Sequence, residues 1–548
     1  MQNSIHNFYN ATITALESDI KKVRKILTYL YLIRLFTFLV FGFFLVFAIL
    51  DSDKTAAIVL SSVSLILFLI AIKYDLQFGY KKRFLQNKLL VNQSELKFLD
   101  HQYSERETGE EYNCLNPHLA ADFDIFGQSS LYQYLNRCST RNGKNRFAEN
   151  LCNSQLDEKI ILEKQNAIKE LSEKKEFIQD FQAYGMFISE SGNELENLQL
   201  WLDEPEEKIK TLQILSVAIP LINIAWITLI ILGFFSVNAL LFPILLSYFV
   251  IGVHEKKIKK AHSRLNKTAK TFEKYTELFE LIEKENFESS FISKLKQKLF
   301  SDEIVTSRSL KILFKLLHRF DLRSNLIVSF ILSTLVIFDI QVYCRLAKWK
   351  AKHKSIVASW FESLSETDVL ISLSTFALNN SDAVSYPKIS EKDFTFNTQE
   401  MGHPLLHPKM RINNSISFGG TPSVIIITGA NMAGKSTFLR TVSVNLILAM
   451  NGAPVCARDF LFTPCDIMSS IKIQDSLSNN ESYFYAELVR IKDILEHSNK
   501  QKKTLVVLDE ILRGTNTKDK QLGSLGLLEK LISQNAVVIV ATHDLMIG

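Results

Sequence analysis

The stretch IIITGANMAGKSTFLR, residues 425–440, determines the fold of the C-terminal part of this chain. It contains a glycine, four residues, and then Gly-Lys-Ser. An apolar β-type run at 424–427 precedes this pattern, and a helical pattern at 436–450 follows it. This order of strand, glycine-rich loop and helix points backbone N–H groups at a phosphate. The stretch therefore predicts the phosphate-binding loop of a nucleotide site in an α/β domain.

The residues of this loop have the chemical types that a nucleotide site requires. Gly429 and Gly434 allow the tight turn, and Lys435 places a catalytic positive charge near the β- and γ-phosphates. The Ser436 hydroxyl suits Mg²⁺. We expect ATP as the ligand and Mg²⁺ as its cofactor, because a chance match would not bring the flanking strand and helix with it. The predicted nucleotide-binding residues are Gly429, Ala430, Asn431, Met432, Ala433, Gly434, Lys435, Ser436 and Thr437.

Two further apolar runs predict the rest of a catalytic site. Residues 504–510, TLVVLDE, form a predicted strand that ends in Asp509, expected to hold Mg²⁺, and Glu510, expected to polarise the attacking water. Residues 536–541 predict another strand. His543 follows that strand at the edge where open α/β sheets bind ligands. We predict that His543 senses the γ-phosphate, with a structural histidine as the alternative. For residues 504–510 the alternative is an ordinary buried strand that ends in acidic residues.

Four segments of the sequence resemble the ATPase domain of MutS-type proteins. An Asn-Met insert before Gly434 and an Arg-Gly-Thr sequence after the acidic pair are not shared by phosphate-binding loops in general. The segments are ITGANMAGKSTFLR (427–440), SYFYAEL (482–488), LDEILRGTNTKD (508–519) and ATHDL (541–545). The resemblance implies an ABC-type P-loop ATPase with a parallel-core sheet that works as a homodimer through this domain.

The same resemblance assigns residues to the dimer. It implies that Ser482 reaches the nucleotide of the opposite subunit, with a helix N-cap as the ordinary alternative. Where the family stacks an aromatic ring on adenine, this chain has Arg411 or Ile412, and a guanidinium plane at Arg411 can stack on the base instead. The residues implied to lie at the dimer interface are Arg513, Gly514, Thr515 and Asn516.

The middle of the chain resembles the family's all-α core domain, the lever that joins DNA-binding parts to the ATPase. DFDIFG at 122–127 and the helical sequence around EKQNAIKEL at 163–171 match its first half, and WFESLSETDVLISLSTFA at 360–377 matches its return helix. The mismatch-reading and connector domains of repair members are expected to have no counterpart in this sequence. A Phe-x-Glu pattern occurs at Phe147, but inside the core match, so we predict that Phe147 packs and Glu149 is solvated.

Two pairs of apolar segments predict membrane hairpins. Residues 211–253 hold no charged side chain, and this segment is long enough for two spans of roughly 20 residues each. This hairpin stands where repair members insert the clamp that closes on DNA. Residues 33–50 and 55–72 form a second pair near the N-terminus. Buried core helices are the alternative for both pairs, and for the shorter apolar stretch 324–338 we predict a core helix.

The basic residues predict the orientation of these spans. Clusters of Lys and Arg flank all four spans on the same side, which the positive-inside tendency assigns to the cytoplasm. We expect a multi-pass protein of the inner, cytoplasmic membrane, with its ATPase domain in the cytoplasm and membrane lipids as partners. The net charge of +5 is modest, and the lysine clusters beside the spans need no nucleic acid to explain them. DNA is a possible partner, but no recognisable reading domain supports it. Six scattered cysteines predict neither a zinc site nor a disulfide framework.

The sequence therefore predicts a membrane-anchored MutS-type ATPase with composite dimer sites and a DNA-related function. The alternatives are a repair protein that binds mismatched DNA and an ATP-driven transporter component, although the signature of transporter ATPases is absent. The family's C-terminal helices are expected to be absent or to lie beyond Gly548. The expected segments are an anchor at 1–100, a first core part at 101–210, the hairpin at 211–253, a second core part at 254–385 and the ATPase domain at 386–548.

Overall fold

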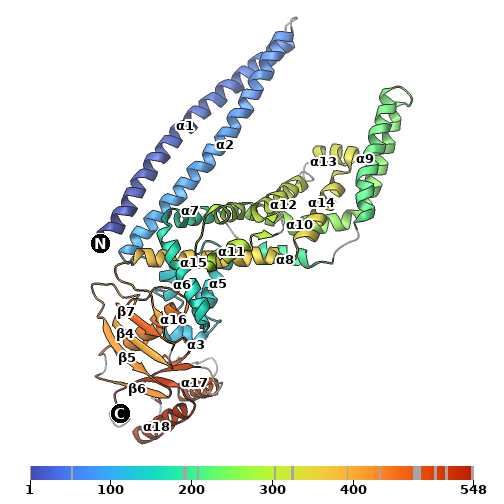
Figure 1. Cartoon of the computed structure of the whole chain (residues 1–548). Helices are drawn as coiled ribbons and strands as arrows, with labels where there is room; N and C mark the ends of the chain where they lie inside the picture. Colours follow the sequence, from blue (N-terminus) through green and yellow to red (C-terminus); the bar gives the residue numbers. More distant parts are fainter. Residues whose placement is uncertain are drawn as a thin grey trace. The chain divides into compact units, whose positions relative to one another are not determined.

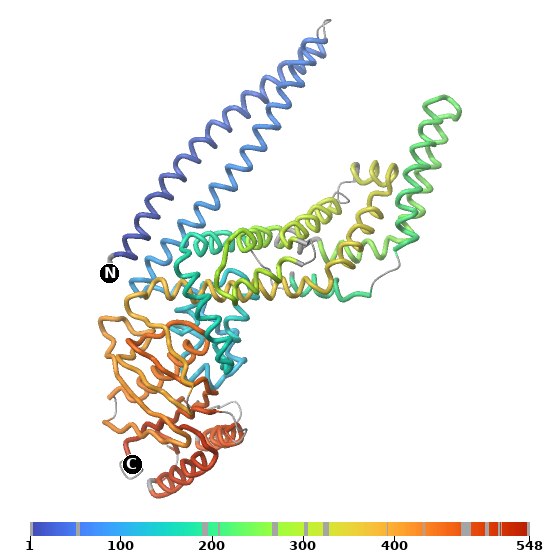
Figure 2. Tube along the Cα trace, viewed as in Figure 1, coloured from blue at the N-terminus to red at the C-terminus, as the bar shows by residue number. Residues whose placement is uncertain are grey.

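The computed structural model divides the chain into two compact units (Figures 1 and 2). The sheet unit consists of Met1–Asn136, Asn150–Met186 and Leu373–Gly548, and the helical unit consists of Arg137–Glu149 and Phe187–Ser372. The structure describes residues 2–50, 54–188, 194–205, 209–301, 304–321, 326–391, 393–430, 433–472, 483–498, 503–512 and 516–544.

A parallel sheet of four strands organises the C-terminal part of the sheet unit. Its order is β6 (Ser423–Thr428), β10 (Val537–Thr542), β9 (Thr504–Asp509) and β8 (Asp466–Ser470), and neighbouring strands pair in parallel throughout. Every residue of β9 and β10 is buried. Such continuous apolar runs are typical of parallel strands that helices cover on both faces. The predicted parallel sheet is confirmed, and β8 is a strand that sequence reasoning did not identify.

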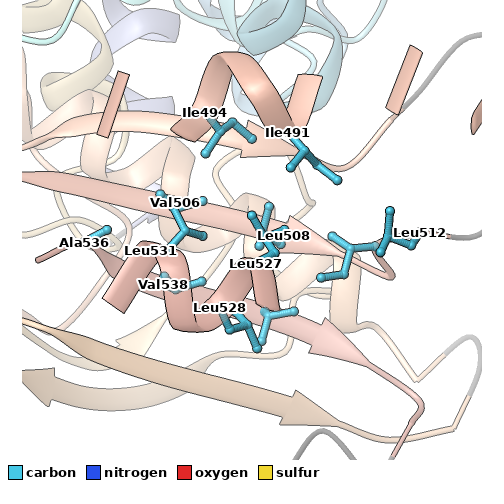
Figure 3. Close-up of a cluster of buried hydrophobic side chains, with 12 residues drawn as sticks. Ile491, Ile494, Val506, Leu508, Leu512, Leu527, Leu528, Leu531, Ala536 and Val538 are labelled. Carbon is cyan, nitrogen blue, oxygen red and sulfur yellow. The ribbon is translucent and has the colours of Figure 1, made fainter. Parts of the chain in front are cut away.

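Helices on both faces of this sheet form its core. On one face, α17 (Tyr483–Ser498) and α18 (Thr517–Ser533) pack their apolar side chains against β9 and β10 (Figure 3). Because side chains alternate along a strand, Val506 and Leu508 point to this face and their neighbours point to the other. There α16 (Lys435–Met450) contacts β9 and β10. The first turn of α16 is thereby fixed beside the carboxyl ends of these strands.

A second, mixed sheet shares this part of the chain, and its strand β7 (Asp459–Phe462) lies between β6 and β8 in sequence. The order of this sheet is β3 (Lys388–Ile389), β7, β4 (Thr395–Met401) and β5 (Asn414–Gly419), with β4 antiparallel to both of its neighbours. Phe394, Phe396 and Phe460 are buried within it. The remaining elements of the sheet unit are the N-terminal helices and short connecting helices: α1 (Gln2–Leu50), α2 (Lys54–Leu99), η1 (Glu110–Tyr112), α3 (Pro117–Asp122), α4 (Leu131–Leu135), α6 (Glu158–Glu173) and α7 (Lys175–Gly185).

The first two helices form a long antiparallel hairpin, seen in blue in Figure 1. At its base, Tyr9 donates a hydrogen bond to Asn379 at 2.7 Å, and Lys88 pairs with Asp180 of α7 at 2.5 Å. Within the apolar part, the two ionisable groups Arg34 and Asp75 pair with each other across the hairpin at 2.5 Å. Both helices are continuous through the predicted spans, so those spans are helical as expected.

The helical unit contains a second hairpin, made by α9 (Lys210–Ile231) and the first half of α10 (Leu241–Lys284). Inside this hairpin, Asn223 donates hydrogen bonds to Ser247 Oγ and to the Thr334 carbonyl, both at 2.8 Å. The other elements are α5 (Arg141–Cys152), α8 (Glu194–Asp203), η2 (Val237–Leu240), α11 (Ser290–Gln297), β1 (Phe300–Ser301), β2 (Ile304–Val305), α12 (Thr306–Asp321), α13 (Leu326–Val336), α14 (Phe338–His353) and α15 (Val357–Asn379).

The apolar stretch at 324–338 differs from the predicted core helix. Its helix α13 lies against α9 and α10, with Phe330 and Ile331 each 49% exposed. The chain then bends by 76° into α14 at Ile337, whose φ is +41°. The stretch is too apolar for a helix that faces water. The helices α9 and α10 cover only part of its surface, so the other part stays exposed. Its exposed face resembles that of the hairpin rather than that of a core helix.

Four helices in the described part of the chain are long and apolar enough to cross a membrane, judged by length and composition. A fifth candidate is the bent pair formed by Val328–Val336 and Phe338–His353. The candidate spans are Ser4–Leu50, Thr55–Leu99, Lys210–Ile231 and Val237–Leu265.

A buried carboxylate fixes α5 to α15 in the helical unit. Asp368 accepts hydrogen bonds from the backbone N–H of Ser139 at 3.0 Å and of Thr140 at 2.8 Å, and from the Thr140 hydroxyl at 2.8 Å. A Cβ on Gly143 would lie 2.3 Å from Asp368, so only glycine fits there. Burial raises the pKa of Asp368 to about 6. Phe147 of the same helix is fully buried, which confirms its predicted packing role.

We expect Asp368→Ala to lower the stability of the helical unit by about 3 kcal/mol, because it leaves buried N–H donors without acceptors. Urea unfolding in detergent, followed by tryptophan fluorescence, measures this loss. Asp203→Ala, at an exposed position of α8, is the matched control and should change stability by less than about 0.5 kcal/mol. Equal effects of the two substitutions would contradict the role of Asp368.

Candidate nucleotide site

The glycine-rich loop lies between β6 and α16, at the carboxyl edge of the parallel sheet. Gly429 has φ +159° and Gly434 has φ +87°, and the latter value strains any residue with a side chain. Gly434 is also the N-cap of α16, and it supplies no side-chain cap. The first N–H groups of α16 thus have no side-chain acceptor, which is the local geometry of an anion site.

The first two residues of α16 contact different parts of the sheet edge: Lys435 contacts the loop, and Ser436 contacts the end of β9. Lys435 Nζ donates to the carbonyl oxygens of Gly429 at 2.8 Å and Ala430 at 3.0 Å, so its ammonium lies over the loop. Ser436 Oγ donates to Asp509 Oδ2, at the end of β9, at 2.5 Å. A hydroxyl and a carboxylate in contact supply two oxygen ligands of the type that Mg²⁺ takes. The structure therefore brings together Ser436 and Asp509, the two predicted metal ligands.

The predicted catalytic base and phosphate sensor are neighbours at the same edge. Glu510 follows β9 with φ +47°, and its N–H donates to the Ala541 carbonyl of β10 at 2.9 Å. Its carboxylate lies 3.5 Å from Nδ1 of His543, which follows β10. The side chain of Glu510 is 20% exposed and that of His543 is 50% exposed. Both groups are accessible to a ligand bound at the loop.

The remaining predicted residues are placed as follows. Asn431, Met432, Ser482, Arg513, Gly514 and Thr515 lie outside the described residues. Asn516 is the N-cap of α18, where its Oδ1 accepts from the Asp519 N–H at 2.9 Å. Arg411 precedes β5, where its Nε donates to Asn413 Oδ1 at 3.1 Å, and Ile412 beside it is 82% exposed. Nothing in this arrangement assigns an adenine-stacking group.

Two family models match this chain in the order that the sequence predicts. MutS domain III matches residues 118–374, and MutS domain V matches residues 425–547, which contain the whole carboxyl edge described above. The chain belongs to the MutS family. The matches cover most of the chain beyond the first hairpin, and the domain III match runs through the α9–α10 hairpin.

Curated relatives match a limited region of this chain. The chain is 38% identical over 162 residues to the DNA mismatch repair protein MutS of Clostridium botulinum, which covers 28% of this chain and 17% of that protein. It is 34% identical over 145 residues to the Endonuclease MutS2 of Lactococcus lactis, which covers 26% of this chain and 18% of that protein. It is 32% identical over 195 residues to the DNA mismatch repair protein MutS of Thermotoga petrophila, which covers 35% of this chain and 24% of that protein. The matched region thus spans about a fifth of these relatives.

Sequence reasoning missed a buried glutamate of this MutS-family site. Glu487 of α17 is 1% exposed, and its Oε1 accepts a hydrogen bond from the Leu512 N–H at 2.5 Å. Leu512 itself has φ +58°, two residues after Glu510. Glu487 therefore holds the turn that follows Glu510 to the helix that follows Ser482. Its position inside the SYFYAEL segment was the signal that could have identified it.

The sequence DFD at 122–124 lies at the end of α3. Its two aspartates contact β8, the residues after it, α16 and α17. Asp122 is 1% exposed and accepts from the Ser469 hydroxyl at 2.7 Å, the Lys472 N–H at 2.7 Å and the Arg490 guanidinium at 3.1 Å. Burial raises the pKa of Asp122 and lowers the pKa of Arg490 of α17 to about 10. Hydrogen bonds from the Lys472 N–H and the Ser469 hydroxyl, together with the Arg440 charge, offset part of this desolvation at Asp122.

The second aspartate of this sequence reaches the helix of the phosphate-binding loop. Asp124 pairs with Arg440 of α16 at 2.9 Å and with Lys472 at 2.7 Å. The carboxylates at 122 and 124 thus bind α17 and α16, and α16 begins at the glycine-rich loop. A displacement of either helix must break or move these ion pairs, which connect the site to the start of the domain III match.

A buried histidine lies close to this network. His403 is 8% exposed, and its Nδ1 accepts from the Leu405 N–H at 3.3 Å. Burial, together with the nearby Arg440 and Arg411 guanidinium groups, lowers the pKa of His403 to about 4, against a smaller opposing effect of Asp124. The imidazole is neutral at pH 7, which fits its role as an acceptor.

This histidine predicts a pH dependence of stability. Its folded pKa lies below its unfolded value of about 6.5, so the unfolded chain binds more protons between pH 6.5 and 4, and stability falls as pH falls through that window. The contribution is on the order of 3 kcal/mol at most. Urea unfolding at pH 7.5, 6.0 and 4.5 should show a smaller loss for His403→Gln than for the natural chain. Parallel curves for the two proteins would contradict this assignment.

Proposed function

We propose that this chain is a membrane-anchored ATPase of the MutS family, which binds and hydrolyses ATP at two composite sites of a homodimer. The observation that carries the proposal is the convergence at one sheet edge of the Gly429–Lys435 loop, the Ser436–Asp509 pair and the Glu510–His543 pair. These are the parts that phosphoryl transfer to water requires: a phosphate cradle, oxygen ligands for a metal, a base and a sensor.

The residues present fit ATP and Mg²⁺. The side-chain-uncapped start of α16 offers backbone N–H groups to phosphate oxygens, and Lys435 can exchange its loop carbonyls for them, because both are oxygen acceptors. Ser436 and Asp509 would hold Mg²⁺, which would neutralise charge on the β- and γ-phosphates. Glu510 would orient and deprotonate the attacking water. His543, next to Glu510, would donate a hydrogen bond to the γ-phosphate.

Composite sites can be tested by mixing two inactive variants. Lys435→Ala should remove the phosphate contact of its own site, and Ser482→Ala should remove the contribution to the partner's site. Each homodimer should hydrolyse ATP at least about 30-fold more slowly than the natural chain. In a heterodimer, however, one site has both Lys435 and the partner-supplied Ser482 intact. An equimolar mixture should regain about a quarter of the natural rate, because about half of random dimers carry one such site.

The outcome distinguishes the parts of the proposal. No hydrolysis by the natural chain would contradict the ATPase function. Hydrolysis that is lost in each variant but not restored by mixing would contradict the sharing of sites between subunits. The matched control is a mixture of Lys435→Ala with the double variant Lys435→Ala/Ser482→Ala, which has no intact site and should stay inactive.

The two apolar hairpins support the membrane part of the proposal. Large apolar side chains are exposed along both of them, including Phe36 at 68% and Phe43 at 66% on α1 and Phe249 at 72% on α10. Exposed apolar surface of this extent is typical of contact with lipid or another protein. The lysine and arginine clusters that flank the spans favour cytoplasmic ends, so the ATPase domain would lie in the cytoplasm of a multi-pass inner-membrane protein.

Binding of mismatched DNA is the second candidate function, favoured by the names of the curated relatives. Against it, the α9–α10 hairpin stands inside the domain III match, and its segment 211–253, which holds no charged side chain, does not suit a phosphate backbone. A gel-shift comparison of matched and mismatched duplex at 50 and 150 mM salt decides between the two. We expect equal, salt-sensitive binding or none; tighter binding of the mismatch would favour the repair function.

A further inference from the structure

A cavity of about 1000 Å³ lies in the helical unit at the foot of the α9–α10 hairpin. Its walls are the end of α8 with Glu204 and Pro205, the first turn of α9, the part of α10 just beyond the apolar run, and the middle of α14. The uncharged sequence 211–253 begins and ends at this level of the two helices. The cavity therefore belongs to the boundary between the apolar hairpin and the charged part of the unit.

The described lining of the cavity is strongly basic. It contains the lysines Lys210, Lys256, Lys257, Lys260, Lys348 and Lys350. Glu204 is the one carboxylate among the described lining residues, and it already pairs with Lys260 at 2.8 Å and with Arg264. An excess of ammonium groups in one concave site attracts an anion, because their fields add there.

The lysines of the cavity fall into two groups. Lys350 is 7% exposed, and its ammonium donates to the carbonyl oxygens of Trp201 at 2.5 Å and Glu204 at 2.8 Å, so it holds the wall together. Lys210, Lys256 and Lys348 have no carboxylate within 4 Å among the residues that the structure describes. The first turn of α9 is a further positive element of the lining, since its N-cap Ile209 makes no side-chain hydrogen bond.

The position of the cavity matches the headgroup level of a bilayer. The 22 residues of α9 extend about 33 Å from Lys210 to the tip of the hairpin, at 1.5 Å per residue. The hydrocarbon core of a bilayer is about 30 Å thick. With the tip at one face of the hydrocarbon, the cavity lies at the other face, on the side of the lysine clusters. Anionic headgroups of the cytoplasmic leaflet lie at this depth.

We propose that this cavity binds the phosphate of an anionic phospholipid headgroup, with Lys210, Lys256 and Lys348 as its ligands. The inference rests on the membrane part of the proposed function and adds a lipid site to it. The apolar residues of the same lining, such as Ile209 and Ala347, would contact the glycerol and the first methylenes of the lipid. A nucleic-acid backbone fits less well, because the cavity adjoins the exposed apolar side chains Ile214 and Val217.

The test uses the full-length protein in nanodiscs of phosphatidylcholine with about 20% phosphatidylglycerol, an anionic fraction chosen to resemble a charged leaflet. Lipids retained by the detergent-extracted protein are quantified by native mass spectrometry. The triple variant Lys210→Gln/Lys256→Gln/Lys348→Gln is compared with Lys315→Gln/Lys409→Gln/Lys530→Gln, three exposed lysines that do not line the cavity. Flotation with vesicles of phosphatidylcholine alone measures insertion separately, since those vesicles carry no net charge.

The natural chain and the control variant should retain phosphatidylglycerol enriched about ten-fold over phosphatidylcholine, and the cavity variant should lose that enrichment while still floating with neutral vesicles. Equal enrichment in all three proteins would overturn the site. Failure of the natural chain to float would reject the membrane anchoring, and the lipid site with it. Competition of inorganic phosphate or duplex DNA for the cavity, with no phosphatidylglycerol retained, would assign the lysines to a soluble anion instead.

Discussion

Replacing Glu510 by glutamine is expected to slow ATP turnover at least about 100-fold, while ATP binding changes less than about three-fold. The amide keeps the size of the carboxylate and its position 3.5 Å from His543, but it cannot take a proton from water. Bound ATP would then persist, and a dimer closed by ATP would accumulate. Single-turnover hydrolysis, ATP-analogue binding and mass photometry in detergent measure the three effects.

Glu496→Gln is the matched control for this substitution. Glu496 lies on α17 with its side chain 66% exposed and pairs only weakly with Lys492 at 3.7 Å. Its loss should leave turnover within about two-fold of the natural rate. Slow turnover in both variants would mean that the rate follows general destabilisation. Natural turnover in Glu510→Gln would contradict the assignment of this residue as the base.

Labelling of the α9–α10 hairpin is expected to show its tip on the outer side of the membrane. In a background with the exposed Cys114 replaced by serine, Ser236→Cys lies at the tip and Lys315→Cys lies on α12 in the charged part of the helical unit. An impermeant maleimide applied to intact cells should label the tip at least about ten-fold faster, because a charge-free hairpin of this length spans the hydrocarbon. The five other cysteines are buried and should react slowly.

Permeabilised cells provide the control for this labelling, because both positions should then react at similar rates. Equal labelling in intact cells would place both positions on one side and contradict the spanning hairpin. In that case Leu221, 62% exposed, and Leu245, 66% exposed, would need a protein partner to cover them.

Local sequence was sufficient for the carboxyl edge of the parallel sheet. The loop that ends in Gly434 needs glycine at a φ of +87°, and the two acidic residues after β9 follow a run with no polar interruption, so pattern and structure coincide. The hairpins were predictable for the same reason, because a long uncharged sequence has few folded alternatives.

Long-range polar contacts could not be predicted in the same way. Asp122 and Arg490 are separated by most of the chain, and nothing local to either indicates that they meet. The mixed sheet was missed because β3 and β7 are short and depend on pairing with β4. The stretch at 324–338 was assigned to a core from its length, whereas its environment depends on Asn223 and Ser247 binding the Thr334 carbonyl.

The most direct test of the proposed ATPase is the rate of ATP hydrolysis by the full-length protein reconstituted in vesicles, compared with Lys435→Ala. Lys435 lies over the loop carbonyls of Gly429 and Ala430, so its ammonium is placed to meet the phosphates there. We predict steady turnover by the natural chain and a loss of at least about 30-fold in the variant. Equal rates in the two proteins, or no turnover in either, would contradict a nucleotide site at this edge of the sheet.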